Sequence, residues 1–267
     1  MRKLALLTLP LLLAGQTQAI EYLNIDKGPE TWSVGATVGF SDTEISFRDK
    51  VDNTEENEDE TSNSQFLSAE YRHELFQLAV ATNQTTDERN NQSDTDKSFL
   101  FKAGTIFTHE DGTALALNML GEVEQDKDNS DSVGLRISAG RHLDQLGFEV
   151  SVDHTQYTDS ENLKAFSSNS LELSLKYQQN QYLTWLAYGY GGVATDVKIK
   201  DVDAESEATT YNFGIGIGSD PISNLDVIFM LLAGNIHNRY DNTKNNEEIA
   251  SRDDDVIASQ LSVSYLF

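Results

Sequence analysis

Apolar and polar side chains alternate with a period of two over much of the chain. In the segment 132–141, the residues Val133, Leu135 and Ile137 share one face, while Arg136 and Ser138 lie on the other. A period of two is typical of a β-strand whose two faces meet different environments. The alternation therefore predicts an all-β protein with a polar and an apolar side to its sheet.

The alternation recurs in about twelve segments that have similar lengths. These are 32–41, 65–72, 75–85, 98–108, 113–124, 132–141, 146–157, 170–178, 182–193, 209–218, 225–235 and 257–267. Most approach the 9–11 residues that a tilted strand needs to cross a bilayer. The segment 182–193 is apolar on both faces, so its register stays open.

The connections between these segments differ by parity. Those after the even segments are short, as at 73–74 and 109–112, while those after the odd ones are mostly longer and acidic, as in 42–64. Short turns at one end, long loops at the other and an even strand number are typical of a transmembrane antiparallel up-and-down β-barrel. A soluble β-sandwich would alternate too, but it would not explain the parity or the charges on the polar face.

The N-terminal residues have the order of a secretory signal peptide. Arg2 and Lys3 precede an apolar run, and small residues follow up to Ala19. This order predicts a signal peptide at 1–19, a short periplasmic segment at 20–31 and a barrel at 32–267. A buried N-terminal helix is the alternative. The chain has no cysteine, which excludes disulfides and thiol catalysis.

The formal net charge of −25 argues against a nucleic-acid partner, because such a surface repels phosphates. The acidic loops are interpreted as solvated, with capture of divalent cations as the alternative. The segment 126–131 alternates oxygen ligands but lacks the glycine and distal glutamate of a calcium hand. No metal site and no cofactor are predicted.

The final strand carries its own pattern, with Leu261, Val263, Tyr265 and Phe267 on one face. This ending resembles the C-terminal signal of Gram-negative outer-membrane β-barrels. The resemblance implies that the last strand pairs with the first and that the barrel-insertion machinery recognises Phe267. It also implies contact with outer-membrane lipid and lipopolysaccharide. In architecture the chain resembles a small porin or a solitary autotransporter-type barrel without a passenger.

If the apolar faces meet lipid, the charged residues of the polar faces point into the lumen. They are Glu70, Arg72, Lys102, Glu122, Glu124, Arg136, Glu149, Asp153, Glu172, Lys176 and Asp226. Two interpretations stay open. The charges form a structural network that keeps the barrel round, or they line a narrow, mildly cation-selective pore.

An enzyme is the least supported hypothesis. The outer-membrane phospholipase family places a histidine two residues before a nucleophilic serine on one strand. Here His154 is followed by Thr155 and Gln156, which departs from that pattern. The sequence therefore favours a non-enzymatic pore or transport protein for small solutes, located in the outer membrane with both termini periplasmic. A closed structural or surface-interaction barrel is the second hypothesis, and a lipid-modifying enzyme is the third.

Overall fold

The computed structural model describes residues 31–267 except 91, 127, 128, 181, 201, 223 and 246, and it does not describe the side chains of 220–222. The signal peptide predicted at 1–19 and nearly all of the segment predicted at 20–31 lie outside the described residues. Within the described part, no helix is long and apolar enough to cross a membrane.

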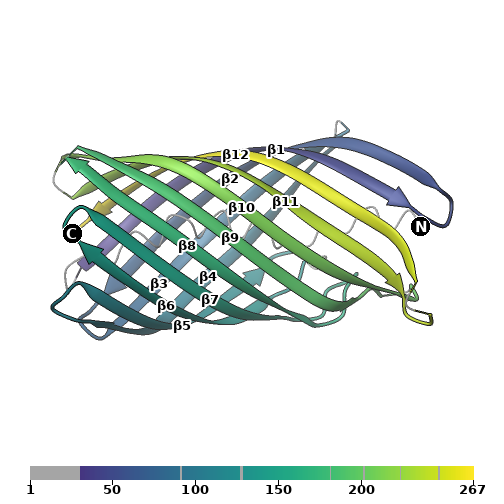
Figure 1. The fold of residues 1–267 in the computed structure, drawn as a ribbon, viewed down its shortest axis with the longest axis horizontal. Coiled ribbons are helices and arrows are strands. Elements are labelled where there is room, and N and C mark those ends of the chain that lie inside the picture. The colour runs from purple at the N-terminus through teal and green to yellow at the C-terminus, as the bar shows by residue number, and fades with distance from the viewer. Residues whose placement is uncertain are drawn as a thin grey trace.

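Twelve antiparallel strands close into a single barrel (Figure 1). They are β1 (Thr31–Asp49), β2 (Thr54–Arg72), β3 (Phe76–Arg89), β4 (Gln92–Thr108), β5 (Thr113–Glu124), β6 (Ser132–Leu143), β7 (Leu146–Tyr157), β8 (Phe166–Asn180), β9 (Leu183–Lys198), β10 (Ala204–Ile222), β11 (Leu225–Asn242) and β12 (Glu248–Leu266). Each strand pairs with its neighbours in sequence, and β12 pairs with β1. The predicted fold class, an up-and-down barrel of about twelve strands, is confirmed.

The first and last strands close the barrel over a long ladder. Val34 lies opposite Tyr265 and Val38 lies opposite Leu261, and the Phe267 amide donates a hydrogen bond of 2.8 Å to the Trp32 carbonyl. Because the ladder is closed, no strand edge is left unpaired. A closed barrel satisfies its backbone groups internally, as a strand structure in hydrocarbon must.

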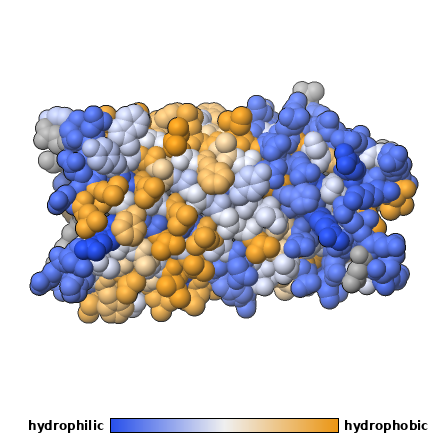
Figure 2. Space-filling model, in the orientation of Figure 1, coloured by the Kyte–Doolittle hydropathy of each residue, from blue (hydrophilic) through white to orange (hydrophobic). Residues whose placement is uncertain are grey.

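An apolar belt covers part of the outer surface (Figure 2). Val34, Val38, Leu173 and Ile215 are each more than 40% exposed and lie on outward positions of three different strands, β1, β8 and β10. Figure 2 shows the belt toward the end of the barrel where the chain terminates, while the other end is hydrophilic. Soluble monomers rarely expose a continuous apolar surface of this extent, so the belt fits a bilayer and not water.

Aromatic residues lie at the short-turn border of the belt. Trp32 and Tyr71 have ring centroids 4.6 Å apart, and the Tyr71 and Phe76 centroids are 5.7 Å apart. Amphipathic rings in this position match the girdle that membrane barrels place at the lipid headgroups.

The strands run further beyond the belt than the sequence analysis expected. The segment 42–64 was predicted as a long acidic loop, yet only 50–53 form the turn between β1 and β2. The prediction was wrong because alternation continues there with its polarity exchanged. Glu44 faces outward, while Ile45 and Phe47 are buried on the inner side. An acidic composition is typical of a loop, but here the carboxylates lie on the water-facing side of a strand. The parts of the strands that continue beyond the belt are called the strand extensions.

Other connections on this end are shorter than predicted for the same reason. The segment 86–97 reduces to a turn near Asn90, and 236–255 reduces to 243–247. The connections 125–131 and 158–165 are the longer ones. The second is tied to the β9–β10 turn, where Leu163 forms an isolated bridge with Ile199 and the Lys200 amide donates to the Asn162 carbonyl.

The inner side of the strand extensions holds an apolar cluster. Its buried members are Phe47, Tyr157, Leu163, Phe166, Ala194, Val197, Ile199, Ala204, Ala208, Tyr240 and Ala250. Tyr157 and Phe166 stack with their centroids 4.4 Å apart. Where lipid no longer covers the outer face, the barrel thus packs as a water-soluble protein does, with apolar side chains inside and charges outside.

Candidate functional site: a charge cluster in the barrel lumen

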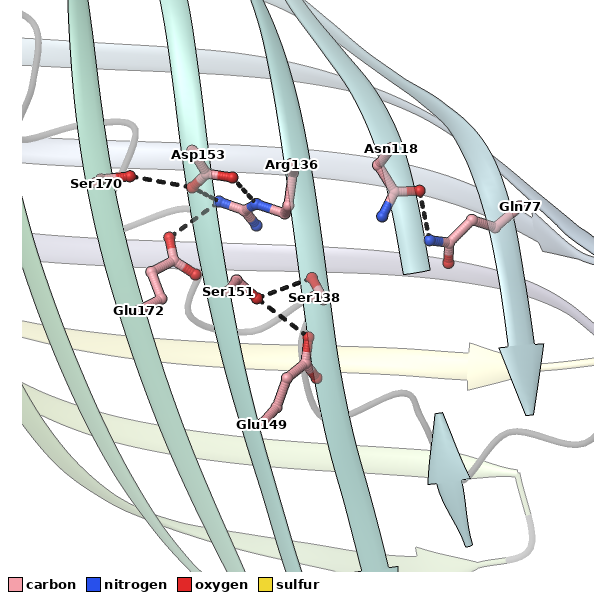
Figure 3. Close-up of polar contacts among 9 residues, drawn as sticks. All are labelled: Gln77, Asn118, Arg136, Ser138, Glu149, Ser151, Asp153, Ser170 and Glu172. Carbon is pink, nitrogen blue, oxygen red and sulfur yellow. Dashed lines mark hydrogen bonds and ion pairs between the residues drawn. The ribbon is translucent and has the colours of Figure 1, made fainter. Parts of the chain in front are cut away.

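Three charged residues from neighbouring strands meet on the inner wall of the barrel (Figure 3). Arg136 on β6 lies opposite Asp153 on β7, and Glu172 on β8 lies opposite Ser151, the next inward residue of β7. The Arg136 Nε donates to Asp153 Oδ1, and its Nη2 donates to Asp153 Oδ2 at 2.6 Å and to Glu172 Oε1 at 3.0 Å. One guanidinium therefore links three strands.

All three side chains are almost completely buried. Arg136 is 2%, Asp153 5% and Glu172 3% exposed. Charges removed from water in this way are costly unless partners hold them in good geometry. The planar guanidinium suits that task because its N–H groups match both oxygens of a carboxylate. The cluster is a built feature of the lumen and not a chance surface ion pair.

Serines extend the cluster toward a third carboxylate. Ser170 Oγ donates to Asp153 Oδ2 at 3.0 Å, and Ser151 Oγ donates to Glu149 Oε1 at 3.3 Å while it pairs with Ser138 at 2.8 Å. The second oxygens of Glu149 and Glu172 accept no hydrogen bond from any described residue. Two carboxylates thus share one guanidinium and a third lies beside them, so carboxylates outnumber cations in this cluster.

The other charges predicted from the sequence lie apart from this cluster. Lys102 on β4 approaches Glu70 on β2 at 3.7 Å, and Glu122 accepts a hydrogen bond of 2.7 Å from Ser98. Arg72 lies near the short turns, where its Nη2 is 3.5 Å from Thr108 Oγ1. On the inward faces, Lys176 opposes Leu186, Asp226 opposes Ser264 and Glu124 opposes Ser98.

Polar amides link β3 and β5 between these groups. Gln77 Nε2 donates to Asn118 Oδ1 at 2.6 Å, and a Cβ on Gly104 of the intervening β4 would lie only 2.2 Å from that oxygen. Glycine at this position is what allows the two amides to meet across a strand.

A small cavity opens beside Lys102 and Glu122. It offers about 70 Å³ to a water-sized sphere, and Phe66, Leu100, Leu120 and Tyr157 also line it. Since one water needs roughly 10–15 Å³ by this measure, the cavity holds a few waters or a very small solute. Its walls are mixed, with one cation, one carboxylate and several apolar side chains.

An apolar wall on the inner side of β9 to β12 was not predicted from the sequence. Leu186, Tyr188, Tyr190, Met230, Leu232 and Ala258 form one buried cluster. The open register of the segment 182–193 is now settled. Trp185 faces outward, whereas Leu186, Tyr188 and Tyr190 face inward. The sequence did contain a signal for this wall, namely that both faces of the segment 182–193 are apolar. Such a strand fits only a barrel whose lumen has an apolar part.

Glycines on β10 make room for this wall. Gly214 and Gly216 face inward, and a Cβ on Gly216 would meet the Met230 sulphur at 2.2 Å. On β9, a Cβ on Gly192 would lie 2.7 Å from the Tyr190 hydroxyl, so that ring lies over Gly192. Gly192 opposes Ser170, and the Tyr190 hydroxyl lies near Ser170. Ser170 therefore joins the aromatic wall to the charge cluster.

At the mouth of the barrel, beyond the belt, a second ion pair is buried. Arg252 Nε donates to Asp254 Oδ1 at 2.7 Å, and the two side chains are 1% and 2% exposed. Burial raises the pKa of the Asp254 carboxyl, and the Arg252 guanidinium opposes that rise.

The histidine considered for catalysis lies on the outer surface. The His154 Nδ1 is 2.9 Å from Asn169 Oδ1, and the next outward residue of β7 is Gln156. An amide therefore stands where the phospholipase pattern places its nucleophilic serine. Within the described part of the chain, no three acidic or imidazole side chains are grouped so that they could hold a metal ion.

The residues of the predicted assembly signal line the outer face of β12. Leu261, Val263, Tyr265 and Phe267 are 39–69% exposed, and the rings of Tyr265 and Phe267 meet edge to face with centroids 4.9 Å apart. This geometry places them on the lipid side of the closing strand. Recognition by the insertion machinery stays a prediction.

Comparison with solved structures places the barrel among outer-membrane proteins in fold. An outer-membrane channel from Pseudomonas putida F1 matches with a TM-score of 0.69 and 12% identity, over 91% of this chain and 98% of the channel. The translocator domain of autotransporter NalP from Neisseria meningitidis matches with a TM-score of 0.59 and 10% identity, over 96% and 95%. The NanC porin matches with 0.51 and 9%, over 85% and 98%.

These solved structures show that the fold is that of outer-membrane channels, porins and an autotransporter translocator domain, as the sequence predicted. No protein-family model matches the chain, and no curated protein matches it. At identities this low, the likeness is one of fold alone.

Proposed function

We propose that the protein is a non-enzymatic channel of the outer membrane that conducts small solutes and prefers cations. The main support for this proposal is the lumen cluster, in which Asp153 and Glu172 share Arg136 while Glu149 lies beside them. Excess negative charge fixed along a narrow passage favours cations over anions. The channel from Pseudomonas putida and the NanC porin share the fold, which agrees with this proposal.

The belt and the signal peptide predicted from the sequence support an outer-membrane location. A barrel with a lipid-facing outer surface and a predicted export signal belongs in the outer membrane, with the short turns and both termini in the periplasm. The hydrophilic strand extensions would then project from the cell surface. Outer-membrane lipid and lipopolysaccharide are the expected partners of the belt.

Planar-bilayer recording of the refolded protein tests the proposal. Under a potassium chloride gradient, the reversal potential should show cation preference. The double variant Glu149→Gln/Glu172→Gln should lose most of that preference. Glu110→Gln, in the exposed turn between β4 and β5, removes a charge away from the lumen and should leave the selectivity unchanged. Absence of conductance, or preference for anions, would favour the closed structural barrel instead.

A lipid-modifying activity is not proposed. The His154 and Asn169 pair is present on the outer surface, but Gln156 occupies the next outward position of the strand. An amide cannot act as a nucleophile. Incubation of the purified barrel with phospholipid or lipopolysaccharide should leave both intact, and release of fatty acid would contradict the proposal.

A further inference from the structure

We infer that the lumen cluster binds organic cations, in which an ammonium or guanidinium group is joined to an apolar or aromatic body. The inference rests on the proposed channel function and names the class of solute that the channel would take. Its two parts are the carboxylates of β7 and β8 and the aromatic wall that starts on β9. They lie side by side, because Glu172 is directly opposite Tyr190 in the β8–β9 ladder.

The carboxylate part supplies the charge. Glu149 and Glu172 are 8% and 3% exposed, and they are near enough to repel each other. Each keeps one oxygen that accepts no hydrogen bond from a described residue. A buried acceptor without a donor is costly, and a buried carboxylate in excess of its cations is more so. A bound cation with an N–H group relieves both costs at once, and a quaternary ammonium relieves the second by supplying the missing positive charge.

The aromatic part supplies the apolar contact. Tyr188 and Tyr190 share the inner face of β9, with Leu186 and Met230 in the same cluster. Both tyrosines lie within the electrostatic range of Glu172. A cation held over a ring face beside a carboxylate gains from both the ring quadrupole and the charge, and quaternary ammonium groups are recognised in this way.

The orientation of Tyr190 is fixed and not incidental. Its ring lies over Gly192, and its hydroxyl reaches Ser170, which in turn donates to Asp153. The ring is thereby held beside the carboxylates. A preorganised ring costs less entropy on binding than one that must be ordered by the ligand.

Other solutes fit the site less well. A hard divalent ion needs six or more oxygen ligands, whereas the cluster has two unengaged carboxylate oxygens. An anion would meet an excess of carboxylates. A neutral hydrocarbon would satisfy the apolar wall but would leave the buried carboxylate oxygens without donors. A cation with an apolar body satisfies both halves.

The test uses benzyltrimethylammonium as the probe in planar-bilayer recordings of the whole refolded protein. The probe should reduce the potassium conductance at concentrations at which added sodium and benzoate do not. Glu172→Gln, which keeps the side-chain volume, should weaken the block about tenfold, and Tyr190→Leu should weaken it by a similar factor. Tyr190→Phe keeps the ring and should retain most of the block.

Glu70→Gln is the matched control, since it removes a lumen carboxylate beside Lys102 and away from the tyrosines. It should leave the block unchanged. If the conductance is cation-selective but the probe blocks it no better than sodium does, the inference is overturned. The proposed channel function would still be supported by that result. If the barrel conducts nothing, calorimetric titration of the refolded protein with the probe decides. Binding that Glu172→Gln abolishes supports the site, and absence of binding overturns it.

Discussion

Arg136 and Asp153 face each other across the β6–β7 ladder, and the guanidinium donates to both oxygens of the carboxylate. The same guanidinium reaches Glu172 on the following strand. Together with Glu172, this pair links three strands from the inside. The lumen network therefore has a structural role in addition to any role in selectivity.

Removal of the shared cation should destabilise the barrel strongly. Arg136→Met leaves Asp153 and Glu172 buried without a counter-charge and should cost about 3–5 kcal/mol of unfolding free energy. Arg136→Lys should cost less but not nothing, because an ammonium cannot donate to both carboxylate oxygens in the same way. Urea unfolding of the barrel in lipid vesicles measures both.

A compensating variant separates charge from packing. In Arg136→Met/Asp153→Leu/Glu172→Met, both carboxylates that are bonded to Arg136 are removed together with it, so stability should recover most of the loss. If this triple variant is as unstable as Arg136→Met alone, the network stabilises through shape and not through charge balance.

The outward face of β8 should tolerate an apolar substitution but not a charged one. Leu173 is 52% exposed at the middle of the apolar stretch, and Leu173→Arg should cost about 2–4 kcal/mol in lipid vesicles. Leu173→Phe, also apolar, should be nearly neutral on the lipid side. As a check, the detergent-free soluble fraction of the cells is assayed for folded protein of each variant. A variant with arginine that stays soluble and folded would show that water and not lipid covers the belt.

The orientation in the membrane can be read from two turns at opposite ends of the barrel. An epitope inserted at Asp52, in the turn 50–53, should bind antibody on intact cells. An epitope at Asp144, in the turn between β6 and β7, should need a permeabilised outer membrane. Asn53 and Asp144 both adopt positive φ, so each turn already has a loop-like backbone that tolerates insertion. The reverse pattern of labelling would invert the proposed topology.

Loss of Phe267 should affect insertion more than stability. Its ring is 69% exposed and contacts Tyr265 alone among the aromatic rings described, while its amide makes one bond to the Trp32 carbonyl. Phe267→Ala keeps that backbone bond. The variant should reach the outer membrane poorly in cells, yet it should refold into detergent almost as the parent does.

Phe213→Ala is the control for Phe267→Ala, since Phe213 is another exposed aromatic residue of the belt, at 65%. It should insert normally. Equal amounts of the two variants in purified outer membranes would argue that Phe267 is an ordinary lipid contact and carries no signal.

The sequence by itself determined the strand number and the side on which most residues lie. The alternation of Leu171, Leu173 and Leu175 with Glu172 and Ser174 assigns the faces of β8, because successive side chains of a strand must point to opposite sides. The inward position of Arg136 could be predicted in the same way. The aromatic ending of the chain indicated closure of the last strand on the first.

Only the tertiary structure decided which residues meet. Alternation fixes a face but not the offset along the strand, since a slip of two residues preserves every face and exchanges every partner. The meeting of Arg136 with Asp153 and Glu172, and of Glu172 with Tyr190, depends on that offset. The strand extensions escaped prediction because beyond the lipid the inner and outer environments exchange polarity. A segment such as 42–49 then has charged side chains outside, and only the closed barrel supplies the apolar interior that keeps it a strand.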